Sequence, residues 1–227
     1  MLALKLGMSI GGSNRPMGAW TPSDETGLEA WYKYQRGITL NGSDVSAWED
    51  SSSNSHDMRQ LTLAEQPAYN SGDILFTPAD TQNLQSASDI TLSGAFTIGI
   101  KLNIAATGGI IIGDNTEVGE LFKIFSTTVL RIKIDNATAV DLELDNATWG
   151  DGYMIVTRNA SNVLNLWWNG VKQTTATPTL SGTANIDTIG VRKTDNNPYD
   201  GTISEIQIYD SSSAALTANI NTYLSTL

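Results

Sequence analysis

The 227-residue sequence contains no cysteine and only one histidine, His56. The lack of cysteine excludes a disulfide framework, a thiolate nucleophile and a zinc site with cysteine ligands. The single histidine excludes a histidine-rich metal site, and no serine stands in a nucleophile-elbow sequence that would indicate a Ser-His-Asp triad. The chain also lacks any apolar run near the roughly 20 residues that span a bilayer, so we expect no membrane insertion.

Charged residues are scarce, at 16%, and acidic residues outnumber basic ones, which gives a net charge of −11. Such a surface repels phosphate backbones, so we expect no nucleic-acid partner. Hydrophobic residues make up 40% of the chain, which is enough for a substantial core. The length fits one large all-β domain as well as two small ones, and much of the polar surface must come from Ser, Thr, Asn and Gly.

Residues 1–25 read as an N-terminal arm or linker that precedes a domain over residues 26–227. The apolar start is interrupted by Lys5 and Gly7, unlike the core of a signal peptide, so we expect synthesis in the cytoplasm without export. Gly, Ser, Asn and Pro cluster at 11–24, which is typical of a linker. We expect this arm to become ordered by docking on a partner. Its candidate contact residues are Met1, Leu2, Leu4, Leu6, Met8 and Ile10.

Alternation of apolar and polar residues recurs within 26–227 and predicts strands with one buried face. The runs at 96–104, 130–134 and 140–144 show it most clearly. Their predicted core residues are Phe96, Ile98, Ile100, Leu102, Ile104, Leu130, Ile132, Ile134, Val140, Leu142 and Leu144. In GLEAWYKY (27–34), Leu28, Ala30 and Tyr32 are predicted to share the core face.

Turn and helix signals complete the pattern. The pair Asn169-Gly170 tolerates the positive φ angles of a type I′ hairpin. Apolar residues recur with helical spacing near the C-terminus behind three serines at 211–213 that can cap a helix. These apolar residues are Leu216, Ile220, Tyr223 and Leu224. The sequence therefore predicts an all-β, antiparallel two-sheet β-sandwich of jelly-roll type with a short C-terminal helix.

Three passages, in this order, resemble landmarks of the laminin-G-like, concanavalin A-like lectin/glucanase family. The first, GLEAWYKYQRGITLNGSDVSAWEDSSSNSHD, ends in a W-x-D-x-S-x-N-x-H loop; the others are GYMIVTRNASNVLNLWWNGVK and YDGTISEIQIYDSSSAALTANINTYL. The likeness covers roughly residues 27–227. It implies a concanavalin A-like jelly roll, and a function among glycan binding, protein binding, glucan hydrolysis and structural support.

Such a domain behind a start like MLALKLGMSI also resembles virion structural proteins of tailed phages, especially phages of marine bacteria. That resemblance implies a non-enzymatic capsid decoration, cement or tail component located in the virion, which docks through its arm. Its partners would be capsid or tail subunits, further copies of itself, and a host surface glycan. The alternatives are a carbohydrate-binding module or adhesin, and a glucan hydrolase.

Catalysis would need paired carboxylates. The glucanase branch of the family carries them on one strand in an E-x-D-x-E pattern, whereas DLELD places Asp141, Glu143 and Asp145 in the inverse order. Trp149 is the one groove-type aromatic nearby, and any solvent-facing strand produces such alternation, so we predict no catalytic residue. Glu205 stands alone in the run 201–209, and we predict that it faces outward or across a sheet edge on a closing strand.

Two binding sites are open to prediction. Calcium, the one candidate cofactor, would be held by loop oxygens from Asp50, Asn54, Asp195 and Asp200 if their loops meet. Ordinary turn chemistry gives the same residues. A glycan would stack on exposed aromatics, for which Trp149 and Trp167 are the candidates, although tryptophan and tyrosine also pack in cores and interfaces.

Overall fold

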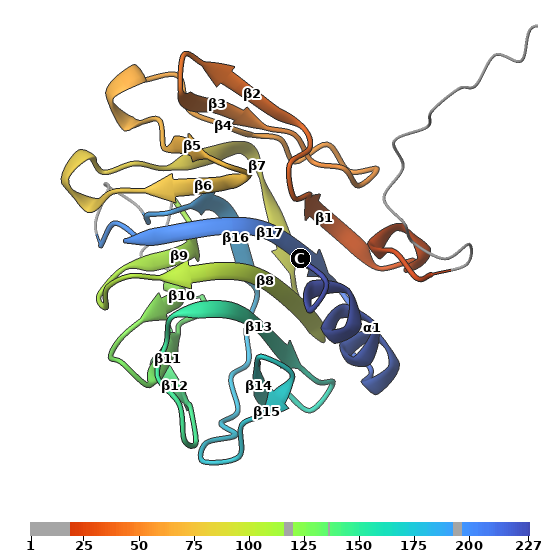
Figure 1. Cartoon of the computed structure of the whole chain (residues 1–227). Helices are drawn as coiled ribbons and strands as arrows, with labels where there is room; N and C mark the ends of the chain where they lie inside the picture. The colour runs from red at the N-terminus through yellow and green to blue at the C-terminus, as the bar shows by residue number, and fades with distance from the viewer. Residues whose placement is uncertain (1–18, 116–119, 136, 193–196) are drawn as a thin grey trace, which may run out of the picture.

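The computed structural model describes residues 19–115, 120–135, 137–192 and 197–227, and it confirms an all-β sandwich with one C-terminal helix (Figure 1). The first layer contains β1 (Leu28–Tyr32), β6 (Asp73–Phe76), β8 (Phe96–Ile104), β13 (Asp151–Arg158), β14 (Leu164–Trp168), β15 (Val171–Lys172) and β17 (Gly201–Tyr209). The second contains β4 (Met58–Arg59), β7 (Leu84–Leu92), β9 (Ile110–Gly113), β10 (Glu120–Ile124), β11 (Val129–Ile132), β12 (Val140–Glu143) and β16 (Ala184–Ile189).

The two layers belong to one antiparallel ladder that folds over at β2 (Ile38–Asn41), β3 (Asp44–Trp48) and β5 (Ala68–Asn70). In the first layer the order is β15-β14-β13-β8-β17, and β1 and β6 pair one after the other with the free edge of β17. In the second layer the order is β12-β11-β10-β9-β16-β7-β4. The short 3-10 helices η1 (Pro22–Asp24), η2 (Leu63–Glu65) and η3 (Pro78–Asp80) lie in connections.

The main hydrophobic core lies between the layers and is built from the predicted alternation. All the predicted core residues of the three clearest runs are buried in it except Val140, which is half-buried at its margin. The predicted hairpin at Asn169-Gly170 is also confirmed. These residues have φ angles of 47° and 80° and join β14 to β15, as a type I′ turn requires.

The prediction that Leu28, Ala30 and Tyr32 share one face of the first strand is wrong for Leu28. Ala30 and Tyr32 lie in the main core, but Leu28 packs on the opposite side of the sheet, beside Trp31. The pairing of β1 with β17 shifts register between Leu28 and Ala30. Such an irregularity breaks the two-residue period, so Leu28 faces away from the core that Ala30 enters.

The C-terminal helix α1 (Ala214–Leu224) covers the outer face of the first layer. Its N-cap is Ser213, whose hydroxyl accepts a hydrogen bond from the N–H of Leu216 at 3.0 Å. All the predicted apolar helix residues are buried in a second cluster between α1 and the sheet. Gly99 of β8 makes room for this packing, because a Cβ there would lie 2.7 Å from Cγ2 of Ile220. We call this side of the first layer the outer face.

Arg158 ties the end of β13 to two loops. Its side chain is fully buried and donates hydrogen bonds to four main-chain carbonyls, those of Leu92, Gly94, Leu180 and Gly182. The guanidinium also lies 4.8 Å from the ring centroid of Phe96. Burial lowers the pKa of Arg158. The four carbonyl dipoles stabilise the buried cation. The cation in turn supplies hydrogen-bond donors to these main-chain carbonyls.

The described part of the predicted arm packs on the domain. Trp20 meets the ring of Tyr223 edge-on at 6.1 Å, and its Nε1 donates to Glu25 at 2.9 Å. The predicted partner-contact residues of the arm, between Met1 and Ile10, lie outside the described residues. Among the helices of the described residues, none is long and apolar enough to cross a membrane.

Candidate functional site

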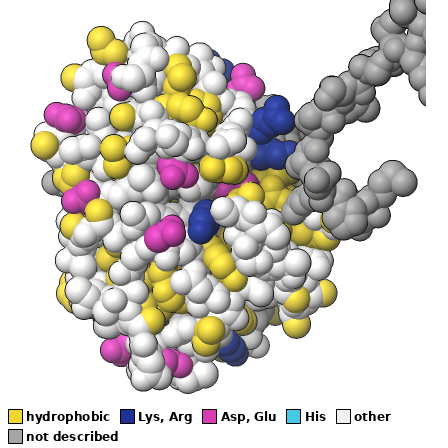
Figure 2. Space-filling model, viewed as in Figure 1, with side chains coloured by type: hydrophobic (Ala, Val, Ile, Leu, Met, Phe, Trp, Pro, Cys, Tyr) yellow, Lys and Arg dark blue, Asp and Glu magenta, His cyan; other side chains and the backbone are white. Residues whose placement is uncertain are grey.

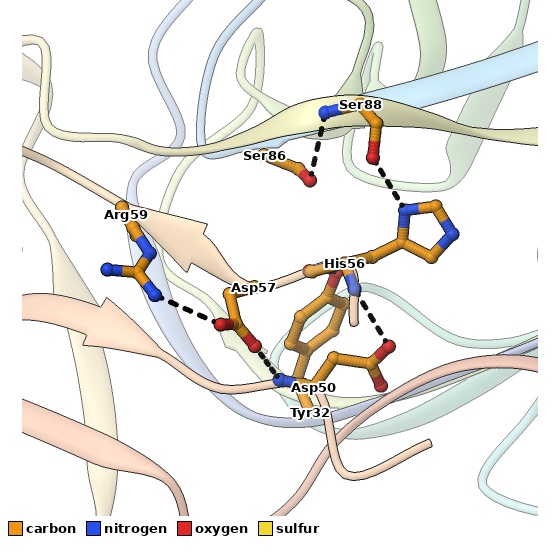
Figure 3. Close-up of polar contacts among 7 residues, drawn as sticks. All are labelled: Tyr32, Asp50, His56, Asp57, Arg59, Ser86 and Ser88. Carbon is orange, nitrogen blue, oxygen red and sulfur yellow. Dashed lines mark hydrogen bonds and ion pairs between the residues drawn. The ribbon is translucent and has the colours of Figure 1, made fainter. Parts of the chain in front are cut away.

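The loop between β3 and β4 is held together by its own carboxylates (Figure 3). Asp50 accepts hydrogen bonds from the N–H groups of Trp31, Ser52 and His56 and from the Ser52 hydroxyl, at 2.6–3.1 Å. Asp57 accepts from the Asp50 N–H at 3.0 Å and pairs with Arg59. These contacts are turn chemistry, in which aspartate side chains satisfy nearby main-chain donors.

The predicted calcium site gains no support from this geometry. The side-chain nitrogen of Asn54 donates to the carbonyls of Leu28 and Glu29. Asp200 directly precedes β17. Asp50 bridges to Tyr32, and Tyr32 pairs with Ile206 of β17. Ile206 is six residues beyond Asp200, so at strand spacing the loops of Asp50 and Asp200 lie roughly 20 Å apart.

Asp195, the remaining predicted ligand, lies outside the described residues. The described residues contain no group of three or more acidic, histidine or cysteine side chains placed to hold a metal ion. Calcium binding therefore stays a prediction.

His56 does not form a catalytic triad. The Ser88 hydroxyl lies 3.3 Å from Nδ1 of the imidazole (Figure 3), but the neighbouring carboxylate of Asp50 contacts the main-chain N–H of His56 and not its ring. A triad needs a carboxylate on the second ring nitrogen to orient the base. The contact between Ser88 and His56 instead joins β7 to the loop before β4.

In the acidic run DLELD, Asp141 and Asp145 make contacts that hold the fold. Asp141 makes two hydrogen bonds with Arg131, at 2.8 and 2.9 Å. Asp145 accepts from the hydroxyl and N–H groups of Thr174 and Thr175, which attaches the segment after β15 to the end of β12. These bonds, with the Thr175 hydroxyl foremost, lower the pKa of Asp145 to about 2. Both carboxylates are thus engaged in contacts that join strands and loops, and the absence of catalysis stays a prediction.

The prediction for Glu205 is wrong in one respect. Its side chain points away from the main core, as its phase predicts, but it is fully buried because α1 and the segment after β1 cover that face. The carboxylate accepts from Trp31 Nε1 at 2.8 Å, Tyr34 N at 3.0 Å and Gln207 Nε2 at 2.8 Å. Burial raises the pKa of Glu205, although these donors oppose the rise.

Asp187 of β16 is a second buried carboxylate, in the other layer. It accepts a hydrogen bond from the N–H of Asn115 at 2.6 Å. Burial, with repulsion from Asp114 and Asp89, raises the pKa of Asp187 to about 6. An ionised carboxylate at this position weakens the fold at neutral pH, since its charge is less well solvated than in the unfolded chain.

The two tryptophans predicted to bind glycan do not form a shared platform. Trp149 is half-buried against the main core and meets Trp168 edge-on at 5.1 Å. Trp167 is half-buried on the outer face, where Lys172 lies 5.5 Å from its ring centroid. The two side chains therefore lie on opposite sides of the first layer, and each packs as part of a core margin.

The structure instead brings together a polar hollow of about 190 Å³ on the outer face, which we call the outer-face pocket. Its polar lining is Tyr34, Asp73, Lys101, Asp151, Thr202 and Ser204, and Leu227 closes one side. β17 supplies Thr202 and Ser204 at a register shift of the sheet, and β8, β13 and β6 supply the charged residues. The volume is below the roughly 300–1,000 Å³ of pockets for drug-sized ligands, so it suits one small polar unit.

Several polar groups of this pocket are unpaired. Among the described residues, the ammonium of Lys101 has no hydrogen-bond partner and only a 3.9 Å approach to Asp151, and no hydrogen bond involves the Tyr34 or Thr202 hydroxyls. Asp73 accepts from the Ser204 hydroxyl through one oxygen, at 2.6 Å. The side chain of Lys101 is only 20% exposed, so its donors point into a confined space.

Comparisons with known proteins agree on the fold. No family model and no curated protein matches the chain. Among solved structures, the binding domain of Paraclostridial mosquitocidal protein 1 matches with a TM-score of 0.53 and 12% identity, covering 91% of this chain and 53% of that one. Trypanosoma rangeli sialidase in complex with 2,3-difluorosialic acid matches with a TM-score of 0.57 and 14% identity, covering 89% and 33%.

This chain therefore spans about half of the first of these neighbours and a third of the second. At such low identity the likeness shows a shared β-sandwich fold.

Proposed function

We propose that this chain is a carbohydrate-binding module that acts without catalysis and holds one sugar unit in the outer-face pocket. The observation that carries the proposal is the set of donors and acceptors in that pocket that have no hydrogen-bond partner among the described residues, from Lys101, Tyr34, Thr202 and the second oxygen of Asp73. A sugar ring offers several hydroxyls, each both donor and acceptor, and so complements such a mixed set. The lectin-like sandwich fold is consistent with this role.

Binding without hydrolysis fits the surroundings of the two pocket carboxylates. The side chain of Asp151 is 78% exposed, so it lacks the dry environment that keeps a catalytic acid protonated. Asp73 is engaged by Ser204. The rival glucan hydrolase would release reducing ends from a glucan substrate, and Asp151→Asn would abolish that release.

The test is binding of a glycan array by the purified chain, followed by titration of each positive sugar. Thr202→Val removes a hydroxyl at nearly constant volume, and Lys101→Met removes the ammonium but keeps most of the side-chain stem. Each is expected to weaken binding about 5- to 30-fold, as the loss of one hydrogen bond to a ligand does. Thr39→Val, on the exposed strand β2, is the matched control and is expected to bind as the parent does.

The predicted tryptophans provide the contrasting outcome. If Trp167→Ala or Trp149→Ala abolishes binding while the pocket variants bind normally, a sugar site exists elsewhere and the pocket is not it. If no glycan binds, the proposed function fails.

A role in a phage particle stays a prediction. A virion protein can display a sugar-binding domain, so the two roles are compatible, with capsid or tail subunits as partners and the virion as location. The sialidase neighbour, in complex with a sialic acid derivative, fits sugar binding, whereas the phage role rests on the sequence resemblance alone. Loss of particle incorporation on deletion of residues 1–18, with the domain still folded, would support the docking arm.

A further inference from the structure

The charges around the outer-face pocket bear on which sugars can enter it. Two carboxylates, Asp73 and Asp151, line it against one ammonium, Lys101. That ammonium is already 3.9 Å from Asp151, so it is partly neutralised before any ligand arrives. Figure 2 shows acidic side chains spread over this side of the molecule and basic ones at few places. The whole chain carries a net charge of −11.

We infer that the outer-face pocket takes an uncharged sugar and disfavours sugars that carry a carboxylate. This inference rests on the proposed function and adds the substrate class. None of the described residues that line the pocket is an arginine, the residue whose guanidinium matches a carboxylate with two parallel hydrogen bonds. A bound acidic sugar would leave its charge facing Asp73 and Asp151 with one shared lysine for compensation.

The hydrogen-bonding inventory points the same way. The second oxygen of Asp73 and the exposed carboxylate of Asp151 are acceptors within the pocket lining that can receive hydrogen bonds from a ligand. Sugar hydroxyls donate as well as accept, whereas a sugar carboxylate only accepts. An uncharged ring can therefore donate to the aspartates and accept from Lys101, Tyr34 and Thr202. An acidic group in the same place would offer the aspartates no donor and would add repulsion between like charges.

The pocket wall is fixed before a ligand binds. The main-chain N–H of Tyr34 donates to the buried carboxylate of Glu205 at 3.0 Å, and the Ser204 hydroxyl holds Asp73 in place. Lys101 sits on β8 directly opposite Glu205 in the pairing with β17. Because its position is set by strand pairing and the Ser204 hydrogen bond, Asp73 cannot easily swing its carboxylate away from an acidic ligand.

The expected size of the discrimination follows from Coulomb's law. One uncompensated carboxylate about 6 Å from a ligand carboxylate, at an effective dielectric constant of about 40, weakens binding about tenfold. Asp151 is the aspartate closer to solvent, so its effect is also reduced by salt.

The test compares matched pairs of neutral and acidic sugars by calorimetric or NMR titration: glucose with glucuronic acid, galactose with galacturonic acid, and lactose with 3′-sialyllactose. The parent chain should bind a neutral member about tenfold or more tightly than its acidic partner. Asp151→Asn keeps the shape and removes the charge, so it should narrow that ratio by up to about tenfold. Asp89→Asn, on an exposed position of β7, changes the net charge equally and should leave the ratio unchanged.

The possible outcomes separate this inference from the proposed function. Neutral sugars that bind preferentially, with a ratio relaxed by Asp151→Asn and not by Asp89→Asn, support both. Acidic sugars that bind as tightly as neutral ones overturn the inference and leave the module a carbohydrate binder. If no sugar in either set perturbs the pocket residues, the proposed function fails and the inference fails with it.

Discussion

Replacement of Arg158 by methionine tests whether hydrogen bonds to main-chain carbonyls hold the end of the sandwich together. Methionine keeps most of the side-chain stem but leaves four carbonyls without their donor. The two buried contacts, to Leu92 and Leu180, should cost about 1–3 kcal/mol each, because their acceptors cannot reach water. Removal of a buried cation offsets part of this cost. We expect a net loss of about 3 kcal/mol in the free energy of unfolding.

Urea denaturation followed by tryptophan fluorescence measures this loss, with the m-value expected to stay constant. For a domain of this size the melting temperature should fall by roughly 6–12 °C. Arg158→Lys supplies one nitrogen in place of three and should give an intermediate loss. Arg36→Met, at an exposed position, is the control and should change stability by less than about 0.5 kcal/mol. A loss below about 1 kcal/mol for Arg158→Met would show that water replaces the guanidinium at these carbonyls.

Three further changes test other parts of the structure. Asp187→Asn should stabilise the fold at pH 7 by on the order of 1–2 kcal/mol. The difference in stability between variant and parent should appear as pH rises from about 4 to 6, because Asp187 loses its proton at lower pH in the unfolded chain than in the folded one. An equal stabilisation at pH 3 would contradict this explanation. Asp145→Ala should speed amide hydrogen exchange at Thr175. In the parent, the hydrogen bonds of Thr174 and Thr175 to Asp145 should be lost as pH falls below about 4 toward the lowered pKa near 2. Slow exchange at Thr175 in the variant would show that Asp145 does not hold this segment. Gly99→Ala should lower the free energy of unfolding by about 1–3 kcal/mol, since its Cβ would meet Ile220. Thermal unfolding measures this loss, and Gly94→Ala, where a Cβ would meet nothing within 4 Å, is the control that should leave stability nearly unchanged.

The fold was predictable from the sequence because most core strands keep a strict two-residue period. In β8 the alternation from Phe96 to Ile104 is uninterrupted, and every predicted inward residue is buried. The same reasoning failed at Leu28, where a register shift in the pairing with β17 breaks the period. Shifts of this kind depend on the partner strand and leave no mark in the strand's own pattern.

The outer-face pocket was not predictable in the same way. Its polar residues come from segments spread between Tyr34 and Ser204, and each one reads as an ordinary solvent-facing position. Glu205 was assigned to solvent for a related reason. Periodicity tells which face of a strand a residue occupies, but it does not tell whether a helix or a neighbouring segment covers that face. Here α1 and the residues after β1 cover it.

The position of β17 inside the first layer, with strands on both of its sides, has a consequence for how the domain forms. β17 comes after every other strand along the chain, yet it joins β1 and β6 on one side to β8 on the other. During translation the earlier strands must wait for residues 201–209 to leave the ribosome before the layer closes, with the apolar edge of β8 unprotected meanwhile. Contacts so distant in sequence also slow folding in the free chain. A nascent chain stalled before residue 200 should therefore stay bound to chaperones, and ordering should begin only once the last strand inserts.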